Sequence, residues 1–210
     1  TVLFVSHNMQ SIKSLCSRCV LISNGKVCRT GLPEEVIHHY LSGDGEQYDS
    51  KWSDLGGLGN EDVRLYQLSV NVMNGEHDTY NILSNLDICV EMKVWIKKPL
   101  SGLCVGFDLI TERGEIVLRS YDTDVSPESL TALHIGENIL SCSIPHGLLN
   151  AGLYFIAPRI GIHNQEWILH CDPLVSFSVI LAHGESHFWN VLDKSNRPGV
   201  ISPVLPWDRI

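Results

Sequence analysis

The sequence lacks any apolar run close to the ~20 residues that a membrane-spanning helix needs. Its longest such run, from Val175 to Ala182, has the length of a strand. The start, Thr1 to Val5, also lacks the basic stretch of a secretory signal peptide. Basic residues are scarce, since 15 Lys and Arg stand against 24 Asp and Glu, a formal net charge of −9. Nucleic-acid binding needs a basic surface, so we expect no nucleic-acid partner.

Catalytic and metal-binding signatures are missing as well. The chain has no G-x-S-x-G nucleophile elbow, and Asp122 and Asp124 stand in a predicted turn, where solvation or capping explains them. The seven cysteines have no disulfide-scaffold spacing, which indicates a reducing compartment, the cytoplasm. Cys16 and Cys19 form the only C-x-x-C pair, which is too little for a zinc site. We therefore predict no metal ion and no enzymatic activity for the chain as given.

The composition is that of a globular protein, with 44% hydrophobic and 19% charged residues among 210. This length allows one domain and a fragment of another. Residues 1–42 carry four Lys and Arg against two Asp and Glu, whereas residues 43–210 carry eleven against twenty-two. We expect these two segments to have different partners. Because the chain has no initial Met and opens inside an apolar run, we also expect residue 1 to be a fragment boundary.

The first 42 residues predict short α/β elements. Asn8 can cap a helix, Asn24-Gly25 is a hairpin signal, and Pro33 opens a helix with acidic residues in its first turn. The predicted order is strand, helix, strand, strand and helix, over residues 1–6, 9–16, 19–23, 26–29 and 33–41. Such a segment cannot bury its own apolar strands, so it indicates an incomplete α/β unit.

The segments FVSHN, CSRCVLISNGKV and GLPEEVIHHYL, in this order, resemble the end of the ATPase domain of ABC transporters. The resemblance implies that His7 is the remnant of the switch histidine, which contacts the ATP γ-phosphate. It also implies ATP and Mg²⁺ as cofactors of the complete subunit. No G-x-x-x-x-G-K-[ST] loop is present to hold the phosphates, so we expect no cofactor and no ATP hydrolysis in this fragment.

Residues 43–62 predict an acidic linker, because five Gly and six Asp or Glu against one Lys pack poorly. From residue 63 the pattern changes to short apolar runs with period-two alternation. Eight strands are predicted, over residues 63–72, 86–97, 103–111, 115–121, 137–144, 152–162, 166–171 and 174–182. Residues 63–210 are therefore expected to form a mainly β domain, an antiparallel jelly-roll or immunoglobulin-like β-sandwich.

Alternation assigns each strand an inward and an outward row of side chains, with Ile116 and Leu118 expected inside and Phe155 outside. Sugar rings pack on aromatic faces, and their hydroxyls need charged donors and acceptors. The outward rows hold such a combination, and the predicted carbohydrate-binding residues are Glu91, Lys93, Trp95, Asp108, Arg119, Tyr121, Arg159 and His163. Trp167 is a weaker candidate. An ordinary solvated face, or a dimer contact at Trp95, is the alternative interpretation.

The tail from His187 to Trp207 combines large apolar residues with prolines. If this tail extended into solvent it would expose much apolar surface, so we expect it to pack along another surface. An exchange of this segment between two copies is one arrangement that achieves this.

The ATPase end, the linker and the sandwich together resemble the ATP-binding subunit of bacterial O-antigen polysaccharide ABC exporters with a carbohydrate-binding C-terminal domain. The ending RPGVISPVLPW adds to this resemblance. It implies a jelly roll that forms a homodimer by C-terminal strand exchange and recognises the non-reducing terminal region of the O-antigen polysaccharide, which licenses export.

The partners that the resemblance implies are a transmembrane exporter subunit and the undecaprenyl-diphosphate-linked glycan. They would place the protein in the cytoplasm, peripheral to the inner membrane. The alternative function is that of a structural dimerisation and docking domain that regulates the ATPase without binding sugar.

Overall fold

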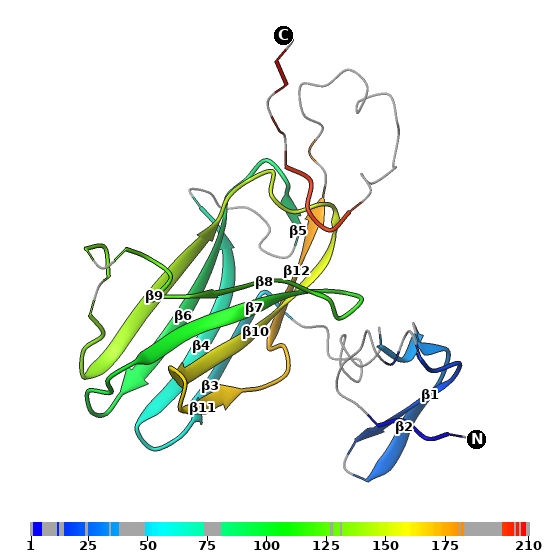
Figure 1. Ribbon diagram of the computed structural model, residues 1–210, viewed down its shortest axis with the longest axis horizontal. Coiled ribbons are helices and arrows are strands. Elements are labelled where there is room, and N and C mark those ends of the chain that lie inside the picture. The colour runs from blue at the N-terminus through cyan, green and yellow to red at the C-terminus, as the bar shows by residue number, and fades with distance from the viewer. Residues whose placement is uncertain are drawn as a thin grey trace.

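The computed structural model is a β-sandwich with a small N-terminal unit beside it (Figure 1). It describes residues 2–5, 12, 15–23, 25–33, 35–37, 49–73, 81–126, 128–130, 132–180, 182, 199–203, 205 and 207–208. The strands of the sandwich form one six-stranded and one four-stranded sheet. The predicted fold class, a mainly β sandwich, is confirmed.

Each sheet is built from strands that are distant in sequence. The six-stranded sheet has the order β5-β12-β10-β7-β8, and β11 also pairs with β10. Its strands are β5 (Asn81–Leu83), β7 (Leu103–Thr111), β8 (Ile116–Tyr121), β10 (Gly152–Ile162), β11 (Glu166–His170) and β12 (Val175–Ile180). The four-stranded sheet has the order β3-β4-β6-β9 and consists of β3 (Lys51–Gly59), β4 (Val63–Val72), β6 (Ile88–Ile96) and β9 (Gly136–Ile144). Among the strands of the sandwich that the structure describes, all pairs are antiparallel except β12 with β5.

The core lies between the two sheets, and the alternation in the sequence predicts most of it. One cluster of buried side chains joins the inward rows of β6 and β7, which are Ile88, Val90, Met92, Val94, Ile96, Val105, Phe107 and Leu109. Tyr154, Ile156 and Ile160 of β10 belong to the same cluster. Full burial of an aliphatic or aromatic side chain of this size contributes about 1.5–3 kcal/mol. These inward rows therefore fix which residues are left on the outer faces.

Ile116 departs from the predicted alternation. Its side chain is 56% exposed, whereas Leu118 packs against the core as expected. Leu109 of β7 pairs with Leu118, but the next residue, Ile110, pairs with Ile116, so the register shifts by one residue on β8. This β-bulge turns Ile116 to the outer face of the sheet, and its predicted inward position is wrong.

The linker predicted over residues 43–62 is wrong for residues 51–59, which form β3 at the edge of the four-stranded sheet. Trp52 and Leu58 pack against the core and anchor this glycine-rich strand. The pairing with β4 skips from Ser53 to Leu58, so the residues between them bulge away from the ladder. Composition alone does not reveal two anchoring side chains. Residues 43–48 lie outside the described residues.

The N-terminal unit contains the predicted hairpin. The strand β1 (Cys19–Ser23) pairs antiparallel with β2 (Lys26–Gly31), and Gly25 in the turn has a φ of 75°, which glycine adopts without a steric penalty. Residues 12, 15, 33 and 35–37 are helical, inside the two predicted helices. Residues 2–5 are exposed and form no strand, since no described strand pairs with them. His7 lies outside the described residues.

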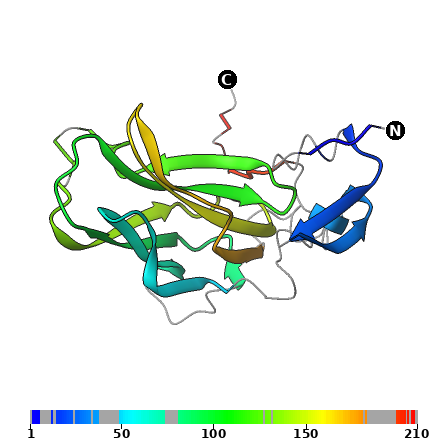
Figure 2. The ribbon, with the colours of Figure 1, turned by 90° about the horizontal axis from the view of Figure 1, so that it is seen from below.

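The N-terminal unit contacts the outer face of the six-stranded sheet. Ile37 forms a buried cluster with Ile110 of β7 and with Phe155 and Ala157 of β10, and Ile12 packs against this cluster. Phe155 points outward as predicted, because it alternates with the core residues of β10. Figure 2 shows the N-terminal unit at one side of the sandwich.

The described part of the C-terminal tail docks on its own chain. Ile201 forms a bridge with Leu149, and the Tyr154 hydroxyl donates to the backbone oxygens of Asn150 and Val200 at 2.9 and 3.1 Å. The expectation that the tail packs along a surface is met for residues 199–202. Residues 183–198 lie outside the described residues, so strand exchange stays a prediction.

No helix with the length and apolarity needed to cross a bilayer occurs in the part of the chain that the structure describes.

We expect Gly106→Ala to lower the free energy of unfolding by about 1–3 kcal/mol, the usual cost of overpacking. A Cβ at Gly106 would lie 2.0 Å from the backbone oxygen of Ser120 on the paired strand β8. Urea denaturation measures the change. The control is Cys104→Ala in the same outward row, which should cost less than about 1 kcal/mol. Equal stabilities of Gly106→Ala and the wild type would contradict the described pairing of β7 with β8.

Candidate functional site

The structure divides the eight predicted carbohydrate-binding residues between two opposite outer faces. Glu91, Lys93 and Trp95 are on β6 of the four-stranded sheet. The others belong to the six-stranded sheet or to the turn after β10, and they are Asp108, Arg119, Tyr121, Arg159 and His163. The two groups cannot form one site, because the hydrophobic core separates them.

A recess of about 560 Å³ lies on the four-stranded sheet around Trp95, and we call it the Trp95 groove. It is lined by Ser53, Asp54, Leu55, Tyr66, Gln67, Lys93, Val94, Trp95 and Glu137. The Trp95 side chain is 45% exposed, so a large aromatic surface is open to solvent here. Of the predicted residues, Lys93 and Trp95 line the groove. Glu91 is two residues further along the outward row of β6.

The strand register places the polar groups of the groove. Ser53, Gln67 and Lys93 are neighbours across β3, β4 and β6, and Trp95 pairs with Glu137 of β9. The Lys93 Nζ and Glu137 Oε2 atoms are 2.8 Å apart, and both side chains are at least a third exposed. An aromatic surface therefore adjoins an amide, a hydroxyl and an ion pair, which together offer hydrogen-bond donors and acceptors.

One wall of the groove comes from the segment predicted to be a linker. The Asp54 carboxylate accepts a hydrogen bond from the Gly56 N–H at 2.7 Å, and Arg64 Nη1 donates to the Gly56 oxygen at 2.6 Å. Gly57 has a φ of 66°, and a Cβ there would lie 3.1 Å from the Tyr66 ring. These contacts fix Asp54 and Leu55 at the rim. Sequence reasoning missed this wall because the bulge depends on the pairing of β3.

On the opposite face, Asp108, Arg119 and Arg159 form a group that we call the arginine cluster. Arg119 donates to both carboxylate oxygens of Asp108, at 2.5 and 2.8 Å, and Arg159 Nε donates to Oδ2 at 2.8 Å. Arg159 Nη1 also donates to the backbone oxygens of Pro158 and Cys171. Burial alone would raise the pKa of Asp108, but the two guanidiniums hold it below its ordinary value. The cluster fastens β7, β8 and β10 to one another.

Two aromatic side chains of β11 border the arginine cluster. The Arg119 guanidinium lies 5.7 Å from the centroid of the Trp167 ring, within the range of a cation–π contact. Trp167 in turn lies 5.0 Å from the His170 ring. Burial, together with the charges of Arg159 and Arg119, lowers the pKa of His170. Trp167, which the sequence marked as the weaker candidate, thus contacts a predicted site residue.

Of the other two predicted residues, Tyr121 lies at the edge of this cluster, where its side chain interacts with Arg119, and His163 lies apart from it. Tyr121 pairs with Gly106 at the end of β8, and the Tyr121 N–H donates to Asp124 Oδ2 at 2.7 Å. His163 is exposed in the turn that follows β10, where its N–H donates to the Gly102 oxygen at 2.8 Å. Neither side chain lines the Trp95 groove.

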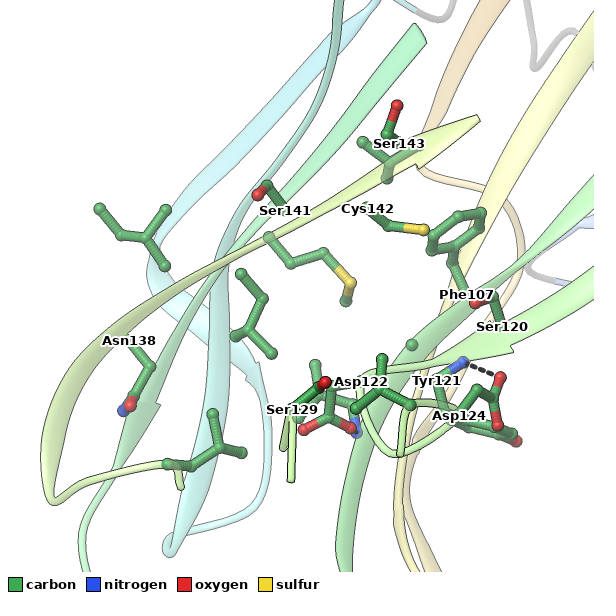
Figure 3. Close-up of a pocket in the computed structure, with 18 of the residues that line it drawn as sticks. Phe107, Ser120, Tyr121, Asp122, Asp124, Ser129, Asn138, Ser141, Cys142 and Ser143 are labelled. Atoms are coloured by element: carbon green, nitrogen blue, oxygen red, sulfur yellow. Dashed lines mark hydrogen bonds between the residues drawn. The ribbon is translucent and has the colours of Figure 1, made fainter. Parts of the chain in front are cut away.

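Another recess, of about 620 Å³, opens between β8 and β9, the end strands of the two sheets (Figure 3). Core residues such as Phe107 line its interior, and serines and Asn138 line its sides. Asp122 Oδ1 accepts a hydrogen bond from the Val105 N–H at 2.8 Å, and Asp124 accepts one from Tyr121. Asp122 thus joins the turn after β8 to β7, and Asp124 caps this turn, in agreement with the capping interpretation of the sequence.

Within the ranges that the structure describes, no three His, Cys, Asp or Glu side chains lie close enough together to hold a metal ion.

The chemistry available at the Trp95 groove is non-covalent recognition. An exposed indole can stack on an apolar ring face, while the charged and amide groups beside it hydrogen-bond to hydroxyls. The arginine cluster differs, since Asp108 is 0% exposed and both its oxygens accept hydrogen bonds from arginine.

No protein-family model matches the chain. A stretch of 88 residues, 41% of the chain, is 32% identical to the methionine import ATP-binding protein MetN of Helicobacter acinonychis (strain Sheeba). The aligned stretch spans 25% of that protein, so the chain covers about a quarter of the length of this curated relative.

Among solved structures, the C-terminal domain of wzt aligns with a TM-score of 0.53 and 15% identity, over 76% of this chain and 87% of that chain. The sandwich has the fold of this wzt domain. A Niemann-Pick type C2 protein from the Japanese carpenter ant aligns with a TM-score of 0.36 and 13% identity, over 60% of this chain and 97% of that one. That score is too low to indicate a shared fold.

We expect Asp108→Asn to lower the free energy of unfolding by about 3–5 kcal/mol, because it leaves the buried charge of Arg159 without its partner. Glu137→Gln breaks an exposed ion pair instead and should cost no more than about 1 kcal/mol. Urea denaturation of both variants at neutral pH measures the difference. A cost for Asp108→Asn as small as that for Glu137→Gln would contradict the structural role of the cluster.

The pH dependence of stability gives a second test of the cluster. The folded-state pKa of Asp108 is lowered, so its ionised form stabilises the fold above the unfolded value of about 3.9. This stabilisation should be lost as the pH falls below about 4, through the folded pKa. Denaturation midpoints of the wild type should therefore decrease more steeply between about pH 4 and 2 than those of Asp108→Asn. Parallel curves would show that Asp108 does not titrate with a lowered pKa.

Proposed function

We propose that this chain is the C-terminal part of the ATP-binding subunit of a bacterial O-antigen ABC exporter. Its sandwich recognises the non-reducing terminal region of the O-antigen polysaccharide at the Trp95 groove, without catalysis, and couples this recognition to export. In the complete subunit ATP and Mg²⁺ would act at the ATPase domain. The partners would be the transmembrane exporter subunit, the lipid-linked glycan and a second copy of the chain, at the cytoplasmic surface of the inner membrane.

The observation that carries the proposal is the Trp95 groove itself. A half-exposed indole stands in a recess beside Gln67 and the Lys93–Glu137 ion pair. Leaving a Trp exposed has a cost in water, which contact with a ring face would offset. Hydrogen bonds from the Gly56 N–H to the Asp54 carboxylate and from the Arg64 guanidinium to the Gly56 oxygen hold the rim at Asp54 and Leu55, which favours a groove formed before a ligand arrives. Preorganisation of this kind lowers the entropy cost of binding.

Two similarities support the exporter context. One is the sequence similarity to an ABC ATP-binding protein, and the other is the fold similarity to the C-terminal domain of wzt. Both are compatible with the sequence resemblance, which leads us to expect an ATPase end and a β-sandwich in one chain.

The competing function is a dimerisation and docking domain that does not bind sugar. The contact between Ile37 and the six-stranded sheet is compatible with it. It differs from our proposal in leaving the Trp95 groove without a ligand.

Titration with lipid-free O-polysaccharide from the organism that encodes the chain tests the proposal, with binding followed by NMR chemical shifts. We expect a dissociation constant on the order of 10⁻³ to 10⁻⁶ M for one site. Trp95→Ala should weaken binding by about tenfold or more, a loss of about 1.4 kcal/mol, because the stacking surface is removed. In Trp95→Ala, the chemical shifts of residues away from the groove should equal those of the wild type.

Trp167→Ala is the matched control, since Trp167 is 51% exposed on the opposite sheet and should leave binding unchanged. Loss of binding in Trp167→Ala or Tyr121→Ala but not in Trp95→Ala would move the site to the face of the arginine cluster. Absence of any shift in the wild type would favour the docking domain.

A further inference from the structure

The outer face of the six-stranded sheet has an apolar area that is covered. Its residues are Leu153, Phe155 and Ala157 of β10 and Ile110 of β7, and we call them the docking patch. Phe155 is 1% exposed although it points away from the core between the sheets. Ile116 of β8 lies on the same outer face and pairs with Ile110 of β7, but its side chain is mostly exposed. Another part of the chain therefore packs on the docking patch and does not reach Ile116.

The cover includes two side chains of the N-terminal unit. Ile37 is 4% exposed and belongs to the same buried cluster as Phe155, Ala157 and Ile110, and Ile12 packs against it. Ile12 and Ile37 come from two different helical segments on either side of the β1–β2 hairpin. Two separate points of contact restrain the orientation of the unit better than one contact could.

The strand register joins the docking patch to the arginine cluster. Phe155 pairs with Ile110, Ala157 pairs with Asp108, and Arg159 pairs with Gly106. Successive outward residues of β10 thus pass from the patch into the cluster. Because Asp108 holds Arg119 and Arg159 in defined positions, the strands beneath the patch are fixed relative to one another. A rigid surface of this kind loses little conformational entropy when a partner packs on it.

We infer that the docking patch is the surface by which the sandwich binds the helices of the preceding ATPase segment. Ile37 and Ile12 are the side chains of these helices that pack on the patch. The Trp95 groove then remains open on the opposite sheet. One sheet would face the glycan and the other the ATPase. The identity of the segment as part of an ATPase rests on the proposed function, whereas the contact itself does not.

The contact joins two parts of one chain. Among the residues that the structure describes, its buried members are Ile37, Ile110, Phe155 and Ala157. Contacts between domains of one chain are usually of the transient kind unless they are large and hydrophobic. We therefore expect the N-terminal helices to dock reversibly on the sandwich. Such a contact can transmit a change at one sheet to the segment that precedes it.

NMR of the 210-residue chain with ¹³C-labelled Ile methyl groups tests the inference. We expect nuclear Overhauser effects between the Ile37 methyl and the Phe155 ring or the Ile110 methyl. In Phe155→Ala these effects should disappear, and relaxation of the Ile37 methyl by a soluble paramagnetic agent should rise several-fold. Ile116→Ala, which alters an exposed side chain on the same face, should change neither signal.

Ile37→Ala provides a second variant whose change lies outside the sandwich. It should shift the Ile110 methyl signal and leave those of Ile88 and Ile96 of β6 in place, so that loss of docking is distinguished from unfolding. Ile37 signals that are equally accessible in the wild type and in Phe155→Ala would overturn the inference. Overhauser effects that arise only between differently labelled copies would also overturn it, by assigning the contact to a second molecule.

The two variants distinguish failure of the docking inference from failure of the glycan function. Phe155→Ala should bind the O-polysaccharide as the wild type does, and Trp95→Ala should retain the Ile37 contact. If the polysaccharide does not bind at all while the Ile37 contact is present, the docking inference stands and the glycan function is wrong.

Discussion

Burial of every second side chain between two sheets is the constraint on which the rest of this structure depends. It fixes the inward rows of β6, β7 and β10, and thereby it leaves Lys93, Trp95 and Phe155 on outer faces. A one-residue slip would exchange the two rows, which would bury charges and expose the core, so the register is strongly determined. Both candidate surfaces therefore derive their position from the same core.

The two outer faces use polar groups in different ways. At the arginine cluster a buried carboxylate is enclosed by two guanidiniums, and the hydrogen bonds hold neighbouring strands together. At the Trp95 groove the ion pair is exposed and contributes little to stability, but its atoms are accessible to a ligand. This contrast is the reason for assigning recognition to the groove and a supporting role to the cluster. The apolar docking patch beside the cluster adds a third kind of surface, one that the N-terminal unit covers.

Much of the fold could be predicted from the pattern of the sequence. The bounds predicted for residues 63–72, 103–111 and 152–162 agree with β4, β7 and β10, because long apolar or alternating runs between turn residues leave little ambiguity. The short β5 was missed, since three residues carry no period, and β3 was taken for a linker because its composition is that of one. The outward position of Ile116 depends on a bulge, which arises from pairing and leaves no local signal.

For the site, the sequence by itself determined which side chains point out of the core, because alternation is a local property of an extended chain. It identified Trp95 and Lys93 of the groove in this way, as well as the members of the arginine cluster. Only the tertiary structure decided that these belong to opposite faces, because the assignment of a strand to one sheet or the other depends on pairing between distant segments. It likewise supplied Tyr66, Gln67, Glu137 and the β3 wall, which meet Trp95 through the register of four strands.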